Sequence, residues 1–161
     1  MTAEMLLEHP NVDPNESNQD GHTPLWLAVE HQNERMVQAL LSHEATNSNF
    51  PTSNGSRPLC LADNLRNAEI MKLLLERADL NPNNQHDDGA TPLWWAVDCG
   101  NGMIVEQLLG HEAIDPNFPT SNGSTPLSRA VKRRSSEIVR LLLEYEYINP
   151  NSRDSDGETP L

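Results

Sequence analysis

The stretch DGATPLWWAVDC, residues 88–99, carries the pattern that decides the fold of this chain. Its Asp-Gly pair supplies the positive φ that a tight turn needs. Thr91 followed by Pro92 is a hydroxyl N-cap with proline at the first helical position, where the missing N–H costs nothing. Leu93, Ala96 and Val97 then share one face of a short helix, which we expect over residues 93–99.

This pattern recurs at a constant interval. The proline-leucine pair begins at residues 24, 58, 92, 126 and 160, so each step is 34 residues. A glycine lies three positions before each pair, and an asparagine recurs on the same interval at residues 15, 49, 83, 117 and 151. Within each full unit a second apolar segment follows at helical spacing, as in Ile104, Val105 and Leu108. Self-similarity at this period is typical of stacked helical repeats.

These residues resemble the ankyrin repeat, whose signature is a Gly-x-Thr-Pro-Leu-His-x-Ala-Ala helix, a Val-x-x-Leu-Leu-Leu helix and a closing Asn. The resemblance implies an all-α, ankyrin-type helical solenoid of helix-turn-helix units with projecting β-turn or hairpin loops. It implies one array over residues 1–161. We expect a half repeat over 1–15, full repeats over 16–49, 50–83, 84–117 and 118–151, and a truncated repeat over 152–161. The spacing and the Asp/Asn-Pro-Asn ending are similar to arrays in fungal proteins, including innate-immunity-like receptors.

The chain departs from the family pattern at three kinds of position. The family's histidine after Pro-Leu is replaced by Trp26, Cys60, Trp94 and Ser128, so its hydrogen bond must be rebuilt or lost. The glycine between the two helices survives only as Gly100, and its counterparts are Gln32, Arg66 and Arg134. A left-handed conformation at those three residues would cost roughly 1–2 kcal/mol each. Arg57 takes the place of a capping threonine.

Composition limits the classes of partner. The formal net charge of −13 opposes binding to nucleic acid and to anionic membranes. No apolar run approaches the roughly 20 residues of a membrane span, and no signal peptide is recognisable at the N-terminus. Cys60 and Cys99 occupy different phases of their repeats, which gives no disulfide framework. We therefore expect an intracellular, cytoplasmic protein, with the nucleus left open, and neither a nucleic-acid nor a membrane partner.

The sequence offers no chemistry for catalysis. His43 and His111 occupy the same repeat position, so duplication accounts for them, and His-Glu-Ala lacks the second histidine of a zinc-protease helix. The glycines are evenly spaced and form no phosphate loop, and no serine has the context of a nucleophile elbow. We expect no enzyme activity, cofactor or metal site.

In the ankyrin family partners usually meet the concave face, formed by the turn tips and the exposed side of the first helix. By position, the tips implied here include Gln19, Asp20, His22, Asp87 and Asp88. Positions 3, 6 and 7 after each proline share one helix face. They are Leu27, Glu30, His31, Leu61, Asn64, Leu65, Trp95, Asp98, Cys99, Arg129, Lys132 and Arg133.

The predicted function is a non-catalytic protein–protein interaction scaffold. We hypothesise a partner with an apolar anchor near Trp95 and acidic residues near Arg129, Lys132 and Arg133. Alternatively, Trp95 packs on Leu61 and the three cations offset nearby carboxylates. A function of another class is a structural spacer or self-associating rod, which the verbatim copy of residues 49–56 at 117–124 favours. Such a rod could grow by head-to-tail association through uncapped ends.

Overall fold

The computed structural model describes residues 12–86 and 88–160 of the chain. Most of the expected half repeat 1–15 and the predicted tip residue Asp87 thus lie outside the described residues. The chain divides into two compact units, Met1–Asn81 (unit 1) and Pro82–Leu161 (unit 2), which are described separately below.

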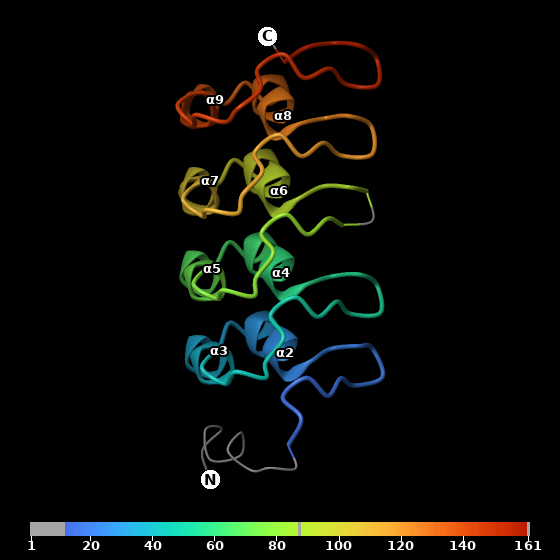
Figure 1. Cartoon of the computed structure of the whole chain (residues 1–161), viewed down its shortest axis with the longest axis vertical. Helices are drawn as coiled ribbons and strands as arrows, with labels where there is room; N and C mark the ends of the chain where they lie inside the picture. Colours follow the sequence, from blue (N-terminus) through green and yellow to red (C-terminus); the bar gives the residue numbers. More distant parts are fainter. Residues whose placement is uncertain (1–11, 87, 161) are drawn as a thin grey trace. The chain divides into compact units, whose positions relative to one another are not determined.

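Each unit is built from two helix pairs. Unit 1 contains α2 (Pro24–Glu30), α3 (Glu34–Leu41), α4 (Pro58–Asn64) and α5 (Ala68–Leu75). Unit 2 contains α6 (Pro92–Asp98), α7 (Gly102–Leu109), α8 (Pro126–Lys132) and α9 (Ser136–Leu143). In unit 1, α2 packs on α4 and α3 packs on α5, and unit 2 repeats this arrangement with α6 on α8 and α7 on α9 (Figure 1). No strand occurs in residues 12–86 and 88–160, so the expected all-α fold class is confirmed.

The first helix of each pair begins at the proline of the repeat. Three of the four carry the predicted hydroxyl cap: Thr23, Thr91 and Thr125 accept a hydrogen bond from the backbone N–H three residues later. At α4 the cap residue is Arg57, and no side-chain cap bond forms there. The predicted loss of the cap in this repeat is therefore confirmed.

The turn between the two helices of each pair has the predicted left-handed residue. Gly100 has φ of 72°, and its counterparts Gln32, Arg66 and Arg134 have φ of 52°, 55° and 58°. Three residues other than glycine thus adopt the left-handed backbone conformation, which costs roughly 1–2 kcal/mol for each residue. The geometry of this turn is dictated by the helix pair, and three of the four repeats keep it without glycine.

A projecting loop, here called a finger, precedes each first helix on the side away from the second helices (Figure 1). In the first finger the N–H of Asn18 donates to the carbonyl of His22 at 3.1 Å, and the N–H of Gly21 donates back to Asn18 at 3.0 Å. Neighbouring fingers within a unit are joined, because Ser53 N–H donates to the Asp20 carbonyl in unit 1 and Ser121 N–H to the Asp88 carbonyl in unit 2.

The recurring asparagine joins each repeat to the next. In unit 1, Asn49 Nδ2 donates to the Asp79 carbonyl at 2.6 Å, and Asn49 Oδ1 accepts from the N–H of Asn81 at 2.8 Å. The same pair of bonds links Asn15 to Ala45 and Asn47, Asn83 to Ala113 and Asp115, and Asn117 to Tyr147 and Asn149. One amide thus satisfies a donor and an acceptor of the following loop, which only Asn can do with a side chain of this length.

Candidate functional site

The predicted site residues lie on the fingers and on the first helices, and all those that the structure describes are at least partly exposed. We call Leu27, Glu30, His31, Leu61, Asn64 and Leu65 the first-helix face of unit 1. The first-helix face of unit 2 consists of Trp95, Asp98, Cys99, Arg129, Lys132 and Arg133. The finger residues Gln19, Asp20 and Asp88 are exposed, and His22 is half-buried.

Two cations of the first-helix face of unit 2 share one carboxylate. Arg129 Nε and Arg133 Nε both donate to Oδ1 of Asp98 on the preceding helix pair, at 2.5 and 2.7 Å. The bonds from Arg133 and Arg129 hold the pKa of Asp98 below its usual range, and outweigh the effect of partial burial. The same carboxylate raises the pKa of Arg133.

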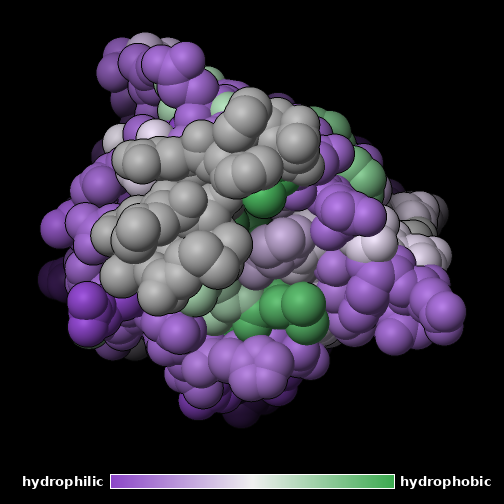
Figure 2. All heavy atoms as spheres, turned by 90° about the horizontal axis from the view of Figure 1, so that it is seen from below, coloured by the Kyte–Doolittle hydropathy of each residue, from purple (hydrophilic) through white to green (hydrophobic). Residues whose placement is uncertain are grey.

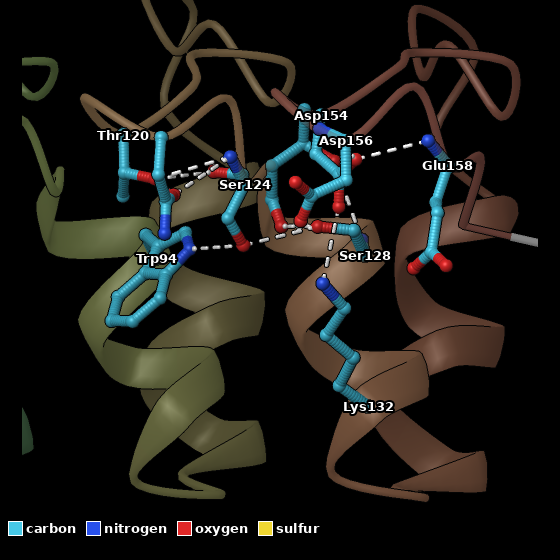
Figure 3. A network of polar contacts seen from close by, with 10 residues as sticks. Trp94, Thr120, Ser124, Ser128, Lys132, Asp154, Asp156 and Glu158 are labelled. Carbon is cyan, nitrogen blue, oxygen red and sulfur yellow. Dashed lines mark hydrogen bonds and ion pairs between the residues drawn. The ribbon is translucent and has the colours of Figure 1, made fainter.

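The third cation is also paired. Lys132 Nζ donates to Oδ2 of Asp154 at 3.2 Å, in the network of Figure 3. Oδ1 of Asp154 accepts from the N–H groups of Asp156 and Glu158, so this carboxylate also organises the last finger. The bond from Lys132 and these backbone bonds lower the pKa of Asp154.

Arg129, Lys132 and Arg133 therefore do not form a free cationic patch. Each is bonded to a carboxylate of unit 2, which is the alternative that the sequence left open. Half of the Lys132 and Arg133 side chains nevertheless stays exposed, 51% and 50%, whereas Arg129 is 30% exposed. The three cations of this face thus form two separate groups of ion pairs, one on Asp98 and one on Asp154 of the last finger.

Trp94, which the sequence analysis did not assign to the site, lies beside the first-helix face of unit 2 and contacts Ser124 and Arg129. Figure 3 shows its bond to Ser124. Its Nε1 donates to Oγ of Ser124 at 3.3 Å, and that hydroxyl lies 3.1 Å from Oγ of Ser128. The Arg129 guanidinium lies 5.0 Å from the centre of the Trp94 ring, a distance at which a cation is attracted to an indole face. At the position of the family's histidine, Trp94 thus donates a hydrogen bond to the following repeat, whereas Nε1 of Trp26 has no partner among the described residues.

Trp95 supplies the largest apolar surface of this face. Its ring meets Trp94 edge-on at 5.6 Å and His86 at 6.0 Å between centroids. The indole Nε1 is buried and has no hydrogen-bond partner among the residues that the structure describes. Trp95 is half-buried, so part of the ring is available for contact with another molecule.

The first-helix face of unit 1 has a different chemistry. Leu27, Leu61 and Leu65 are half-buried, and the exposed Glu30 and Asn64 lie among them. Nδ1 of the exposed His31 is 2.8 Å from the Leu27 carbonyl. His22 stacks on Trp26 with centroids 3.7 Å apart and an angle of 15° between the rings. This face is apolar and weakly charged, whereas that of unit 2 is dominated by ion pairs.

A groove of about 520 Å³ lies on the second helix pair of unit 2. Its apolar lining is Val131, Val139 and Leu143, and its polar rim consists of Arg134, Ser136, Arg140 and Glu144. The residues one repeat earlier that correspond to the apolar lining are Val97, Val105 and Leu109. These three are buried, at 0%, 0% and 9% exposure, whereas Leu143 is 42% exposed. The groove therefore corresponds to the surface of α6 and α7 that α8 and α9 cover one repeat earlier.

Other kinds of site find little support in the described part of the chain. It contains no group of three His, Cys, Asp or Glu residues placed to hold a metal ion. None of its helices has the length and apolar character needed to cross a membrane. Burial and the nearby Asp63 raise the pKa of the Cys60 thiol to about 12, so this cysteine is not a thiolate near neutral pH. Figure 2 shows a face on which hydrophilic residues predominate, as expected for a net charge of −13.

Comparisons with known proteins agree with this architecture. A family model described as ankyrin repeats (three copies) matches residues 2–84 and 63–154. The ankyrin repeat domain of Bcl-3, described as a unique member of the IkappaB protein family, is similar in structure, with a TM-score of 0.88 and 26% identity over 98% of this chain and 69% of that one. The ankyrin repeat protein EF0377 has a TM-score of 0.85 and 26% identity over 98% of this chain and 80% of that one. A search of curated proteins gives no significant match.

Proposed function

Because this chain belongs to the ankyrin-repeat family, whose members generally mediate protein–protein interactions, we propose that it binds a protein partner through its fingers and first-helix faces. The ankyrin fold is typically a non-enzymatic interaction module. In this proposal the chain acts inside the cell as a scaffold without catalytic activity. The resemblance to arrays of fungal innate-immunity-like receptors stays part of the proposal and rests on the repeat spacing and the Asp/Asn-Pro-Asn ending.

The observation that carries the proposal is where the repeats differ. Framework positions repeat: the residue four after each proline is alanine, and Ala28, Ala62, Ala96 and Ala130 are buried, at 5% exposure or less. The positions of the first-helix faces change in chemistry, from Trp95 and Asp98 in one repeat to Arg129 and Lys132 in the next. Different exposed chemistry in successive repeats is what recognition of one particular partner requires.

The proposed partner presents an apolar group to Trp95 and acidic groups to the cations beside it. The half-exposed side chains of Lys132 and Arg133 support this proposal, since an arginine fork has donors beyond the one that it gives to Asp98. The ion pairs limit the gain: an incoming carboxylate must share these cations with Asp98 and Asp154. We therefore place the larger part of the binding energy on Trp95, because aromatic residues are frequent anchors of interfaces.

A quantitative pull-down tests this proposal. The baits are the unmodified chain, a Trp95→Ala/Arg133→Glu variant of the first-helix face, and a Met103→Ala/Arg35→Glu control. The control removes an exposed methionine (62% exposed) from α7 and reverses an exposed cation on α3, so it makes matched changes on second helices. A protein retained by the unmodified chain and the control but lost by the face variant supports the proposal. Equal capture by all three baits contradicts it.

A second candidate function is self-association into a rod, and the groove on α8 and α9 favours it. Its apolar lining corresponds to residues that another helix pair covers in the preceding repeat. The occupant in this candidate is a second copy of the chain, docked head to tail. Light scattering at increasing concentration should then show a growing mass for the unmodified chain and for Met103→Asp, but not for Leu143→Asp. A monomer at high concentration removes this candidate.

A further inference from the structure

Asp63 occupies a core position of α4. The residue five after the proline is Val29, Val97 or Val131 in the other three full repeats and Asp63 in this one. Val29 and Val97 are 0% exposed, and Asp63 is 1% exposed. An ionisable side chain has thus replaced an apolar one without moving to the surface.

No hydrogen bond from a described residue compensates the Asp63 carboxyl for its burial. Neither Oδ1 nor Oδ2 has a hydrogen-bond partner among the residues that the structure describes. Burial raises the pKa of Asp63 from its ordinary value of 3.8 to about 7, although the charge of Arg66 lowers it. A buried carboxylate that lacks partners is destabilising, and a group in this situation takes up a proton instead.

The titratable groups around Asp63 are few. Arg66 follows the helix, Cys60 lies one turn earlier, and Arg57 precedes α4. The helices packed against α4 in unit 1 are α2 and α5, and their other titratable residues are Glu30, Glu69 and Lys72, all exposed. None of these groups donates a hydrogen bond to the carboxylate.

Among the first helices of the four described pairs, α4 is the one whose start has no side-chain cap bond. Arg57 provides no cap bond, whereas the threonines before α2, α6 and α8 do. A missing cap leaves a backbone N–H of the first helical turn without a partner from the cap residue. Two weaknesses thus coincide in one seven-residue helix: a missing cap and a carboxyl in its core face.

We propose that Asp63 is a proton-operated switch, in which loss of its proton opens α4 and its packing on α5, and uptake of the proton closes them. The inference does not depend on whether the first-helix face binds a partner. If it does, the half-buried Leu61 and Leu65 of that face are carried by the switched helix. A proton would then regulate how much of the face is ordered.

The direction of the pH dependence follows from linkage. The folded helix holds the proton up to a pH of about 7, and the opened helix holds it only up to about 3.8. Between these values the closed state binds more protons, so its advantage falls as the pH rises. The opening constant should increase by up to about tenfold per pH unit from pH 4 to 7 and then level off, since both states are ionised at higher pH.

Hydrogen exchange of the full chain, resolved by mass spectrometry and corrected for intrinsic exchange rates, tests the switch. We expect the opening constant of the α4 amides to rise through this window in the unmodified chain. In Asp63→Val it should be smaller and nearly independent of pH, while Glu106→Gln, which neutralises an exposed carboxylate on α7 of unit 2, should keep the original slope. The general charge repulsion of an acidic chain is common to all three proteins, so the difference in slope isolates Asp63.

A flat profile for the unmodified chain between pH 4 and 7 would overturn the proposal, and so would an unchanged slope in Asp63→Val. If that variant does not fold, the carboxyl ¹³C resonance of Asp63 in the unmodified chain decides the question. A midpoint well above pH 5 supports the switch, and a midpoint near 3.8 rejects it.

Discussion

Asn117 holds the loop after α9 with both atoms of its side-chain amide. Its Nδ2 donates to the Tyr147 carbonyl at 2.7 Å and its Oδ1 accepts from the N–H of Asn149 at 2.6 Å. Asn117→Ala removes one donor and one acceptor and leaves two backbone groups without their partner. We expect this change to lower the free energy of unfolding by about 1–2 kcal/mol, measured by urea denaturation followed by circular dichroism.

Asn151 is the matched control for this prediction. It occupies the same repeat position, and the structure shows no bond from its side chain to any described residue. Asn151→Ala should therefore change the free energy of unfolding by less than about 0.5 kcal/mol. Equal losses in the two variants would mean that the ladder of asparagine bonds does not stabilise the repeats.

Gly89 is required for two separate reasons, and Gly157 for only one. Both residues have φ of +79°, but a Cβ on Gly89 would lie 2.7 Å from the backbone nitrogen of Ser121, whereas a Cβ on Gly157 would meet nothing within 4 Å. Gly89→Ala should thus destabilise the chain by about 1–3 kcal/mol more than Gly157→Ala, because the neighbouring finger must shift. Similar thermal or urea denaturation curves for the two variants would contradict this account of the fingers.

Single helices differ in how well their starts are capped, and this difference can be corrected. Arg57→Thr should raise the free energy of unfolding by about 1 kcal/mol, because the new hydroxyl can accept the bond that α4 lacks. Thr125→Ala should lower it by a similar amount, since Thr125 accepts from the N–H of Ser128. Urea denaturation of both variants checks the pair. A loss of stability in Arg57→Thr would show that the arginine has a structural role of its own.

Local sequence determines most features at the level of helices and turns. The helix expected over residues 93–99 is α6, Pro92–Asp98, because Thr91 and Pro92 define its start by local chemistry. The left-handed turns at Gln32, Arg66 and Arg134 were also predictable, since Gly100 of the third full repeat marks that position. The partners of the first-helix face were not predictable. Asp98 lies 31 residues from Arg129, and only the stacking of α6 on α8 brings them together.

The position of Asp63 could have been recognised by aligning the repeats, because valine stands five residues after the proline in the other three. What the sequence does not contain is the lack of a hydrogen-bond partner. That property depends on the side chains that the folded helices place around the carboxyl. The same reasoning applies to Trp94, whose bond to Ser124 crosses 30 residues.

At the scale of the whole molecule, the two units should respond differently to acid, because among the described residues only unit 1 contains a carboxyl with a raised pKa. The pKa of Asp98 in unit 2 is lowered, chiefly by the bonds from Arg133 and Arg129, so the stability that this group contributes is present above its ordinary pKa of 3.8 and is lost as the pH falls below it. Asp63 in unit 1 has a raised pKa, and its protonated form is favoured on the acidic side of about pH 7.

Acidification from pH 7 to 4 should therefore stabilise unit 1, whereas further acidification to pH 2 should destabilise unit 2. Hydrogen exchange of peptides from each unit measures the two effects separately. Asp98→Asn should weaken the loss in unit 2 below pH 4 and leave unit 1 unchanged. If Asp98→Asn and the unmodified chain lose protection in parallel below pH 4, the ion pairs of Asp98 do not determine the acid stability of unit 2.

The claim at the centre of this account is that the varied first-helix faces and fingers bind a protein. The most direct test is the dissociation constant of a captured partner for Trp95→Ala/Arg133→Glu, compared with that for Met103→Ala/Arg35→Glu. We predict at least a tenfold weaker complex for the face variant and an unchanged affinity for the second-helix control, with the same helical content in both. An affinity that falls only in the second-helix control, or in neither variant, would contradict the claim.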